Sequence, residues 1–263
     1  MEYIGYLASI LIGITLGLIG GGGSILTIPI LVYLFNINPK LATTYSLFIV
    51  GFTAAIGAVR HYRMGNIMLK PALLFAVPSL ATLIFVRKSI LPLLPETIFS
   101  SGGFTFTKGA LIMALFAVLM VAASYSMISK GTDHPIKTQT STVKTMLIGA
   151  LVGIVTGFLG AGGGFLIIPA LLFFNGMSMK QAVGTSLLII AFNSLFGFLG
   201  DVVNGIAINY AFLLTIAIFA TVGIFIGTLL SKKIDGAKLK PAFGWFVLVM
   251  GIYIITKELF FPK

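Results

Sequence analysis

The 263-residue chain contains no cysteine, only two histidines and only six acidic residues. The absence of cysteine excludes disulfide bonds, thiolate metal sites and thiol chemistry. His61 and His134 lie in polar connectors and offer little for a metal centre, so we expect neither a metal nor another cofactor. Charged residues make up only 9% of the chain, whereas a soluble domain has about 25%. The composition therefore excludes an ordinary soluble protein.

Long apolar runs take the place of the missing charges. Hydrophobic residues form 58% of the chain, and the mean hydropathy is +1.12. Several uncharged runs approach or exceed the ~20 residues of a membrane-spanning helix; they cover 41–59, 71–86, 109–129, 181–200, 202–231 and 241–256. The N-terminal sequence has no basic leader and no cleavage site, so we expect the first apolar segment to remain in the protein. The sequence predicts an all-α, polytopic membrane protein in a lipid bilayer.

The net charge is +11, which in a soluble protein would suggest nucleic acid. Here the lysines and arginines stand singly or in pairs at the ends of apolar runs, without a basic stripe. Membrane topology and contact with lipid headgroups explain such a pattern. We therefore expect no nucleic-acid partner.

The chain contains an internal duplication. Residues 11–65 align without gaps on residues 151–205, with 19 identities in 55 positions. Shared hydrophobicity alone would not align glycines, prolines and polar residues together; the matched pairs include Gly20/Gly160, Gly22/Gly162, Pro29/Pro169, Ser46/Ser186 and Gly65/Gly205. A single long period indicates two halves rather than a solenoid. The sequence predicts a first repeat at 1–129, a linker at 130–144 and a second repeat at 145–263.

Each half begins with an apolar segment that a glycine cluster interrupts. The expected pairs of short helices are 3–19 with 24–35 and 145–159 with 165–174, and three longer helices follow each pair: 41–59, 70–86 and 106–129, then 181–199, 209–231 and 241–260. The stretch 87–108 is rich in proline, serine and glycine, which predicts a loop.

The two short helices on either side of each glycine cluster can be placed in the membrane in two ways. As a re-entrant hairpin they make the repeats inverted and put 11 of the 17 lysines and arginines on one side. As one interrupted crossing they make the repeats parallel and split these residues 9 to 8. The positive-inside rule favours pseudo-symmetric inverted repeats with a cytoplasmic linker. Length agrees, because residues 3–35 as one helix would run about 50 Å, too long for a ~30 Å core.

The glycine clusters predict a binding site. Four glycines in a row end a helix and free backbone groups that survive in a membrane only inside protein or along a cavity. The helix that restarts presents free N–H groups and a positive dipole end, which bind anions. The candidates are Gly20, Gly22, Gly23 and Ser24 in the first half and Gly160, Gly162, Gly163 and Gly164 in the second. The alternative is that these glycines only let helices pack closely.

Hydroxyl groups near the starts of the next helices could also donate to a bound anion. The candidates are Thr44, Ser46, Thr185 and Ser186, with the mid-helix amide of Asn193. Ordinary interhelical hydrogen bonding is an equal alternative for each. No acidic residue lies inside a predicted span, so a buried proton relay or sodium site has no candidate.

Four segments together resemble the TauE/SafE family of sulfite and organosulfonate exporters over essentially the whole chain. They are Gly-Leu-Ile-Gly-Gly-Gly-Gly-Ser-Ile-Leu-Thr-Ile-Pro at 17–29, Arg-His-Tyr-Arg-Met-Gly-Asn at 60–66, and Gly-Phe-Leu-Gly-Ala-Gly-Gly-Gly-Phe-Leu-Ile-Ile-Pro at 157–169 with Gly-Thr-Ser at 184–186. The resemblance implies a multi-pass plasma (inner) membrane protein that exports small sulfur oxyanions. It also implies a pathway along the glycine breaks and the hydroxyl-bearing helix starts.

These observations predict a secondary transporter of a small anion such as sulfite or a sulfonate. An anion channel with a glycine-lined filter is the alternative. An enzyme is disfavoured because the predicted spans contain no cysteine, histidine or carboxylate. The sequence leaves the substrate, the coupling ion and the oligomeric state open, a homo-oligomer included.

Overall fold

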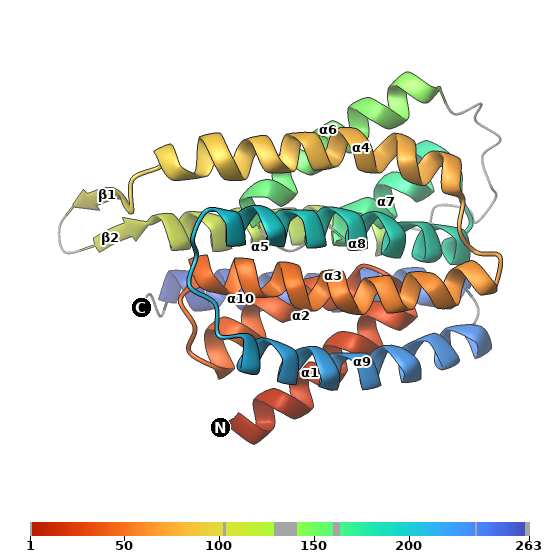
Figure 1. Cartoon of the computed structure of the whole chain (residues 1–263), viewed down its shortest axis with the longest axis horizontal. Coiled ribbons are helices and arrows are strands. Elements are labelled where there is room, and N and C mark those ends of the chain that lie inside the picture. The colour runs from red at the N-terminus through yellow and green to blue at the C-terminus, as the bar shows by residue number, and fades with distance from the viewer. Residues whose placement is uncertain (1, 102–103, 129–140, 160–163, 235, 261–263) are drawn as a thin grey trace.

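The computed structural model describes residues 2–101, 104–128, 141–159, 164–234 and 236–260 (Figure 1). These residues form ten α-helices: α1 (Glu2–Ile19), α2 (Gly22–Pro29), α3 (Pro39–Arg63), α4 (Leu69–Phe85), α5 (Lys108–Ile128), α6 (Thr142–Leu159), α7 (Gly164–Asn175), α8 (Met179–Val203), α9 (Tyr210–Lys233) and α10 (Gly236–Phe260). A π-helical turn, η1 (Ile30–Leu34), continues α2, while η2 (Val86–Ile90) and the 3₁₀ turn η3 (Leu91–Leu93) continue α4. An antiparallel hairpin of β1 (Thr97–Ser101) and β2 (Phe104–Thr107) precedes α5.

Five of the described helices are long and apolar enough to cross a membrane, which confirms the predicted all-α membrane class. They are α3, α4 with its extension to Leu93, α6, α8 and α9. Within the most hydrophobic window of α3 and of α8, 72% of the residues are buried, against 33–44% in the other three spans. The molecule is therefore built around α3 and α8.

The central helices start at polar residues that cap them. The side chain of Asn38 accepts a hydrogen bond from the Lys40 N–H at 2.9 Å, and Pro39 occupies the first helical position. Ser178 and Gln181 form a reciprocal capping box at the start of α8. Such caps satisfy N–H groups that a helix start leaves free. These caps fix the starts of α3 and α8, the two central spans.

The central pair runs antiparallel. Thr44, near the start of α3, bonds to Asp201, near the end of α8. At the other end the Met68 N–H, just after α3, donates to Thr185, near the start of α8, at 3.1 Å. We call the end of the bundle with the β1–β2 hairpin the hairpin end, where α3 begins and α8 ends, and the other the opposite end (Figure 1).

Two further pairs flank this centre, with α1 against α9 on one side and α4 against α6 on the other (Figure 1). Both contacts depend on glycine. A Cβ atom on Gly17 of α1 would lie 2.8 Å from the Thr228 nitrogen of α9, and one on Gly157 of α6 would lie 2.8 Å from Val86 Cβ. Close helix packing, the alternative considered above, therefore accounts for the glycines inside α1 and α6.

The predicted loop at 87–108 is wrong in part. The helix that begins at Leu69 continues through η2 and η3 to Leu93, and the β1–β2 hairpin follows. Neither a charged pair nor a proline ends the helix immediately, because Arg87 is buried against other helices and Pro92 sits in the first turn of a 3₁₀ segment. Arg87 thereby lies inside a candidate span rather than beyond it.

Candidate functional site

The first glycine cluster breaks the chain between α1 and α2. The Gly20 N–H still bonds to the Leu16 carbonyl at 2.7 Å, but Gly20 itself has φ of +77°, a conformation that favours glycine. Gly21 then occupies the N-cap position of α2 and makes no side-chain capping hydrogen bond. The new helix begins at Gly22, two residues before the predicted start at Ser24, and so presents uncapped N–H groups inside the protein.

The second cluster has the same arrangement as far as it is described. The first half-helix, α6, ends at Leu159 and the second, α7, begins at Gly164, one residue before the predicted start at Phe165. The predicted site residues Gly160, Gly162 and Gly163 lie outside the described residues.

The two breaks meet. A Cβ atom on Gly164 would lie 2.8 Å from Gly21 Cα and 3.1 Å from Ser24 Oγ. A Cβ atom on Gly20 would lie 2.7 Å from Ser186 Oγ. The starts of both half-helices and the hydroxyl-bearing part of α8 therefore come together from segments 140 residues apart. Their free N–H groups and dipole ends provide the positive potential that an anion needs.

Most predicted hydroxyl groups at this place already have partners. Ser24 donates to the Gly21 carbonyl at 2.7 Å, and Ser186 donates to the Val183 carbonyl at 2.9 Å. Thr185 accepts from the Met68 N–H. Each hydroxyl oxygen keeps a lone pair or can rotate, but an anion would have to displace the local bond to receive the proton.

Ser46 and Asn193 have spare hydrogen-bonding capacity. Ser46 Oγ is buried and has no hydrogen-bond partner within the described residues. Asn193 Nδ2 donates to Ser79 Oγ at 2.7 Å, which joins α8 to α4, while its Oδ1 lacks a partner there. The bond to Ser79 is the interhelical contact considered as the alternative for Asn193.

Gly23 contacts a different part of the structure. A Cβ atom there would collide with the Ile12 carbonyl and lie 2.8 Å from Leu16 Cβ, both in α1. The absence of a side chain at Gly23 is thus needed for α2 to fold back on α1. A bulky substitution at Gly23 would disturb folding as well as any bound anion.

A buried ion pair, which the sequence does not predict, lies toward the hairpin end. Arg87 Nε donates to Asp201 Oδ1 at 2.9 Å, and Nη2 forms an ion pair with Oδ2 of the same carboxylate. Thr44 Oγ1 donates to Asp201 Oδ2 at 2.6 Å. The expectation that no carboxylate lies inside a span is therefore wrong, since α8 continues through Asp201 to Val203.

His61 is a second departure from the sequence prediction. It lies within α3 rather than in a polar connector, and it is fully buried. Its Nδ1 stands 3.4 Å from Asn66 Nδ2, and its Nε2 has no partner within the described residues. Helical spacing explains the burial, because His61 lies three residues after the buried Ala58 and seven after the buried Ala54, on the same face of α3.

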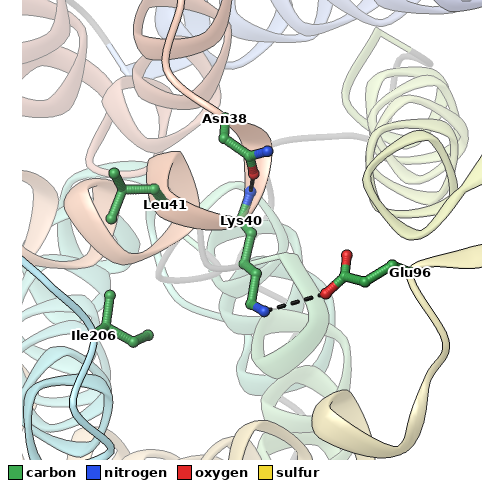
Figure 2. Close-up of a pocket in the computed structure, with 5 residues that line it drawn as sticks. All are labelled: Asn38, Lys40, Leu41, Glu96 and Ile206. Atoms are coloured by element: carbon green, nitrogen blue, oxygen red, sulfur yellow. Dashed lines mark hydrogen bonds and ion pairs between the residues drawn. The ribbon is translucent and has the colours of Figure 1, made fainter.

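A pocket of about 410 Å³ opens at the hairpin end (Figure 2). Its described lining residues are Asn38, Lys40, Leu41, Glu96 and Ile206. Lys40 Nζ reaches toward Glu96 Oε1 at 3.2 Å, and both side chains are largely exposed. An exposed pair of this kind adds little stability. Lys40 is therefore an exposed cation near the start of α3, with its charge only weakly bound to Glu96.

Interrupted half-helices that face one another inside a bundle of membrane spans are typical of membrane transporters. The family model described as "Sulfite exporter TauE/SafE" matches residues 5–254. The chain belongs to the TauE/SafE family, a transporter family, and this confirms the resemblance seen in the sequence.

Its relatives carry names of the same class. A probable membrane transporter protein of Xylella fastidiosa is 32% identical over 257 residues, covering 94% of this chain and 92% of that protein. The probable membrane transporter protein YdhB of Bacillus subtilis is 26% identical over 251 residues, covering 95% and 98%. The whole chain, rather than one segment, thus corresponds to a multi-pass membrane transporter.

Proposed function

We propose that the protein is a secondary transporter that exports a small sulfur oxyanion, sulfite or a sulfonate, across the plasma (inner) membrane. The anion binds where the starts of α2 and α7 meet. The observation that carries this proposal is the contact of Gly164 with Gly21 and Ser24, which brings two uncharged but electropositive helix ends to one point. A site built from dipoles binds an anion without placing a permanent charge in the membrane.

The two halves, 1–129 and 145–263, serve as inverted repeats in this proposal. The corresponding helices α3 and α8 run antiparallel, and so do α5 and α10, where Gly244 near the start of α10 lies against Ile128 at the end of α5. The pair α1–α9 also has its counterpart in the pair α6–α4. Exchanging the halves leaves these pairings unchanged, as a pseudo-two-fold axis requires.

Local hydrogen bonds support the same correspondence. The Asn66 N–H donates to the His61 carbonyl at 3.0 Å, and the Ile206 N–H donates to the Asp201 carbonyl at 3.3 Å, 140 positions later. The Asn209 N–H donates to Tyr45 Oη at 2.9 Å, and the position equivalent to Tyr45 is Thr185, which accepts a bond from Met68. Two inverted halves around one site provide the machinery for alternating access.

Counterflow of labelled sulfite in proteoliposomes tests the proposal. A carrier reorients faster with substrate bound, so we expect labelled sulfite to enter faster when the vesicles contain unlabelled sulfite than when they are empty. Vesicles without protein are the control. A purely conductive flux that preloading does not accelerate would instead identify an anion channel with the glycines as its filter. No sulfite or sulfonate flux of either kind would refute the proposed substrate class.

A further inference from the structure

Arg87 is held by groups from three helices. Its guanidinium bonds to Asp201 of α8 through Nε and Nη2, and Nη1 lies 3.4 Å from the Gly157 carbonyl of α6. Nη2 also lies 3.5 Å from Thr44 Oγ1 of α3. The side chains of Arg87 and Asp201 are each only 6% exposed. Arg87 and Thr44 together hold a carboxylate by its two oxygens, the geometry with which arginine binds planar oxyanions.

The rest of the fold does not require this ion pair. At the opposite end, the packing of α1 on α9 and of α6 on α4 places Thr228 and His61 at the positions equivalent to Arg87 and Asp201. Thr228 is buried and uncharged and donates to the Ile224 carbonyl of its own helix at 2.8 Å, and within the described residues no ion pair bridges these helices there. A buried ion pair is costly to desolvate and adds little net stability over apolar packing. The pair at the hairpin end therefore calls for a role other than closing the bundle.

Its position connects the pocket to the second glycine break. Leu41, in the pocket lining, is one helical turn before Thr44, and Ile206, also in the lining, bonds back to the Asp201 carbonyl. On the inner side, Arg87 bonds to Gly157, which lies in the last turn of α6 before the break. An anion passing between the pocket and the half-helix starts would meet this pair on its way.

We propose that Arg87 and Thr44 form an oxyanion-binding site, which the carboxylate of Asp201 occupies while no substrate is bound. The proposal builds on the proposed function, since the displacing ligand is the same class of anion, a sulfite or sulfonate with two oxygens on one sulfur. The exchange replaces one oxyanion by another on the same guanidinium. A lone buried arginine would hold the anion too tightly for release, whereas the returning carboxylate takes its place.

Binding of sodium sulfite and of sodium methanesulfonate to the purified protein, measured by calorimetry, tests this competition. Replacing Asp201 removes the internal competitor and leaves Arg87 and Thr44 in place, so we expect Asp201→Asn to lower the Kd for both anions by about tenfold or more. In the double variant Arg87→Gln with Asp201→Asn, no buried charge is left unpaired, and we expect binding to weaken by about tenfold or more relative to the native protein. Glu258→Gln, which removes an acid from α10, is the matched control and should keep the native Kd.

Two results would overturn the inference. One is a folded Asp201→Asn protein, with a cooperative melting transition, that binds no tighter than the native chain. The other is a double variant that binds both anions with the native Kd. This second result would overturn the inference even if the single variant Asp201→Asn does not fold. If either result is found while the native protein shows sulfite counterflow, only the inference about Arg87 is refuted. If the native protein shows neither flux nor binding, the proposed function itself is refuted.

Discussion

Replacing Arg87 with methionine should lower the free energy of unfolding by about 3–5 kcal/mol, the cost of leaving one partner of a buried ion pair alone. The methionine fills much of the volume of the arginine stem, so the loss reports on charge rather than on a cavity. Among the described residues, it leaves the carboxylate of Asp201 with Thr44 as its remaining side-chain partner. Unfolding in mixed micelles with increasing SDS, followed by circular dichroism, measures the change.

The double variant Arg87→Met with Asp201→Leu is the control for this prediction. Both charges are then absent, and two apolar side chains occupy the site, so most of the lost stability should return. The difference between the double variant and the sum of the single variants gives the interaction energy of the pair. If the double variant is as unstable as the two single variants combined, the pair has no coupling and does not join η2 to α8 in the folded protein.

Much of the architecture could be predicted because it depends on local sequence. A run of glycines cannot continue a helix, so the position of the break at Gly20 and Gly21 follows from residue type alone. The uncharged runs between charged residues give α3, α6, α8 and α9 to within about four residues, whereas the span that begins at Leu69 continues to Leu93. The antiparallel course of α3 and α8 is also the one that the distribution of lysine and arginine favours, because that distribution reflects the direction in which each helix crosses.

The charged cluster could not be predicted by the same reasoning. Asp201 ends an uncharged run and stands beside polar and glycine residues, so it resembles a residue in a connector. Its burial depends on Arg87, which is 114 positions away and also follows an apolar run. One difference was visible in the sequence: of the two equivalent positions, one carries His61 and the other Asp201, although the glycine pairs Gly57/Gly197 and Gly65/Gly205 on either side match. Because the repeats are identical at only 19 of 55 aligned positions, this difference alone does not predict an ion pair.

Substituting leucine for Gly164 should reduce sulfite counterflow by about tenfold or more, since small misplacements at a binding site have large effects on rate. A Cβ atom added at this position would lie 2.6 Å from Ile190 Cδ1 and 2.8 Å from Gly21 Cα. The larger leucine side chain must therefore separate the two breaks or fill the space between them. Gly164 begins α7, where leucine does not weaken the helix. Counterflow in proteoliposomes, normalised to the amount of inserted protein, measures the effect.

Gly200→Leu is the matched control because a Cβ atom at Gly200, in α8, would meet nothing within 4 Å. The control adds the same apolar side chain to a membrane helix but makes no new contact with either glycine break. Gly164 is a better position for this test than Gly23, whose substitution would also push α2 away from α1. If Gly164→Leu and Gly200→Leu both transport sulfite at the native rate, the anion does not pass between the half-helix starts. The convergence of the two breaks would then serve helix packing alone, as the glycines of α1 and α6 do.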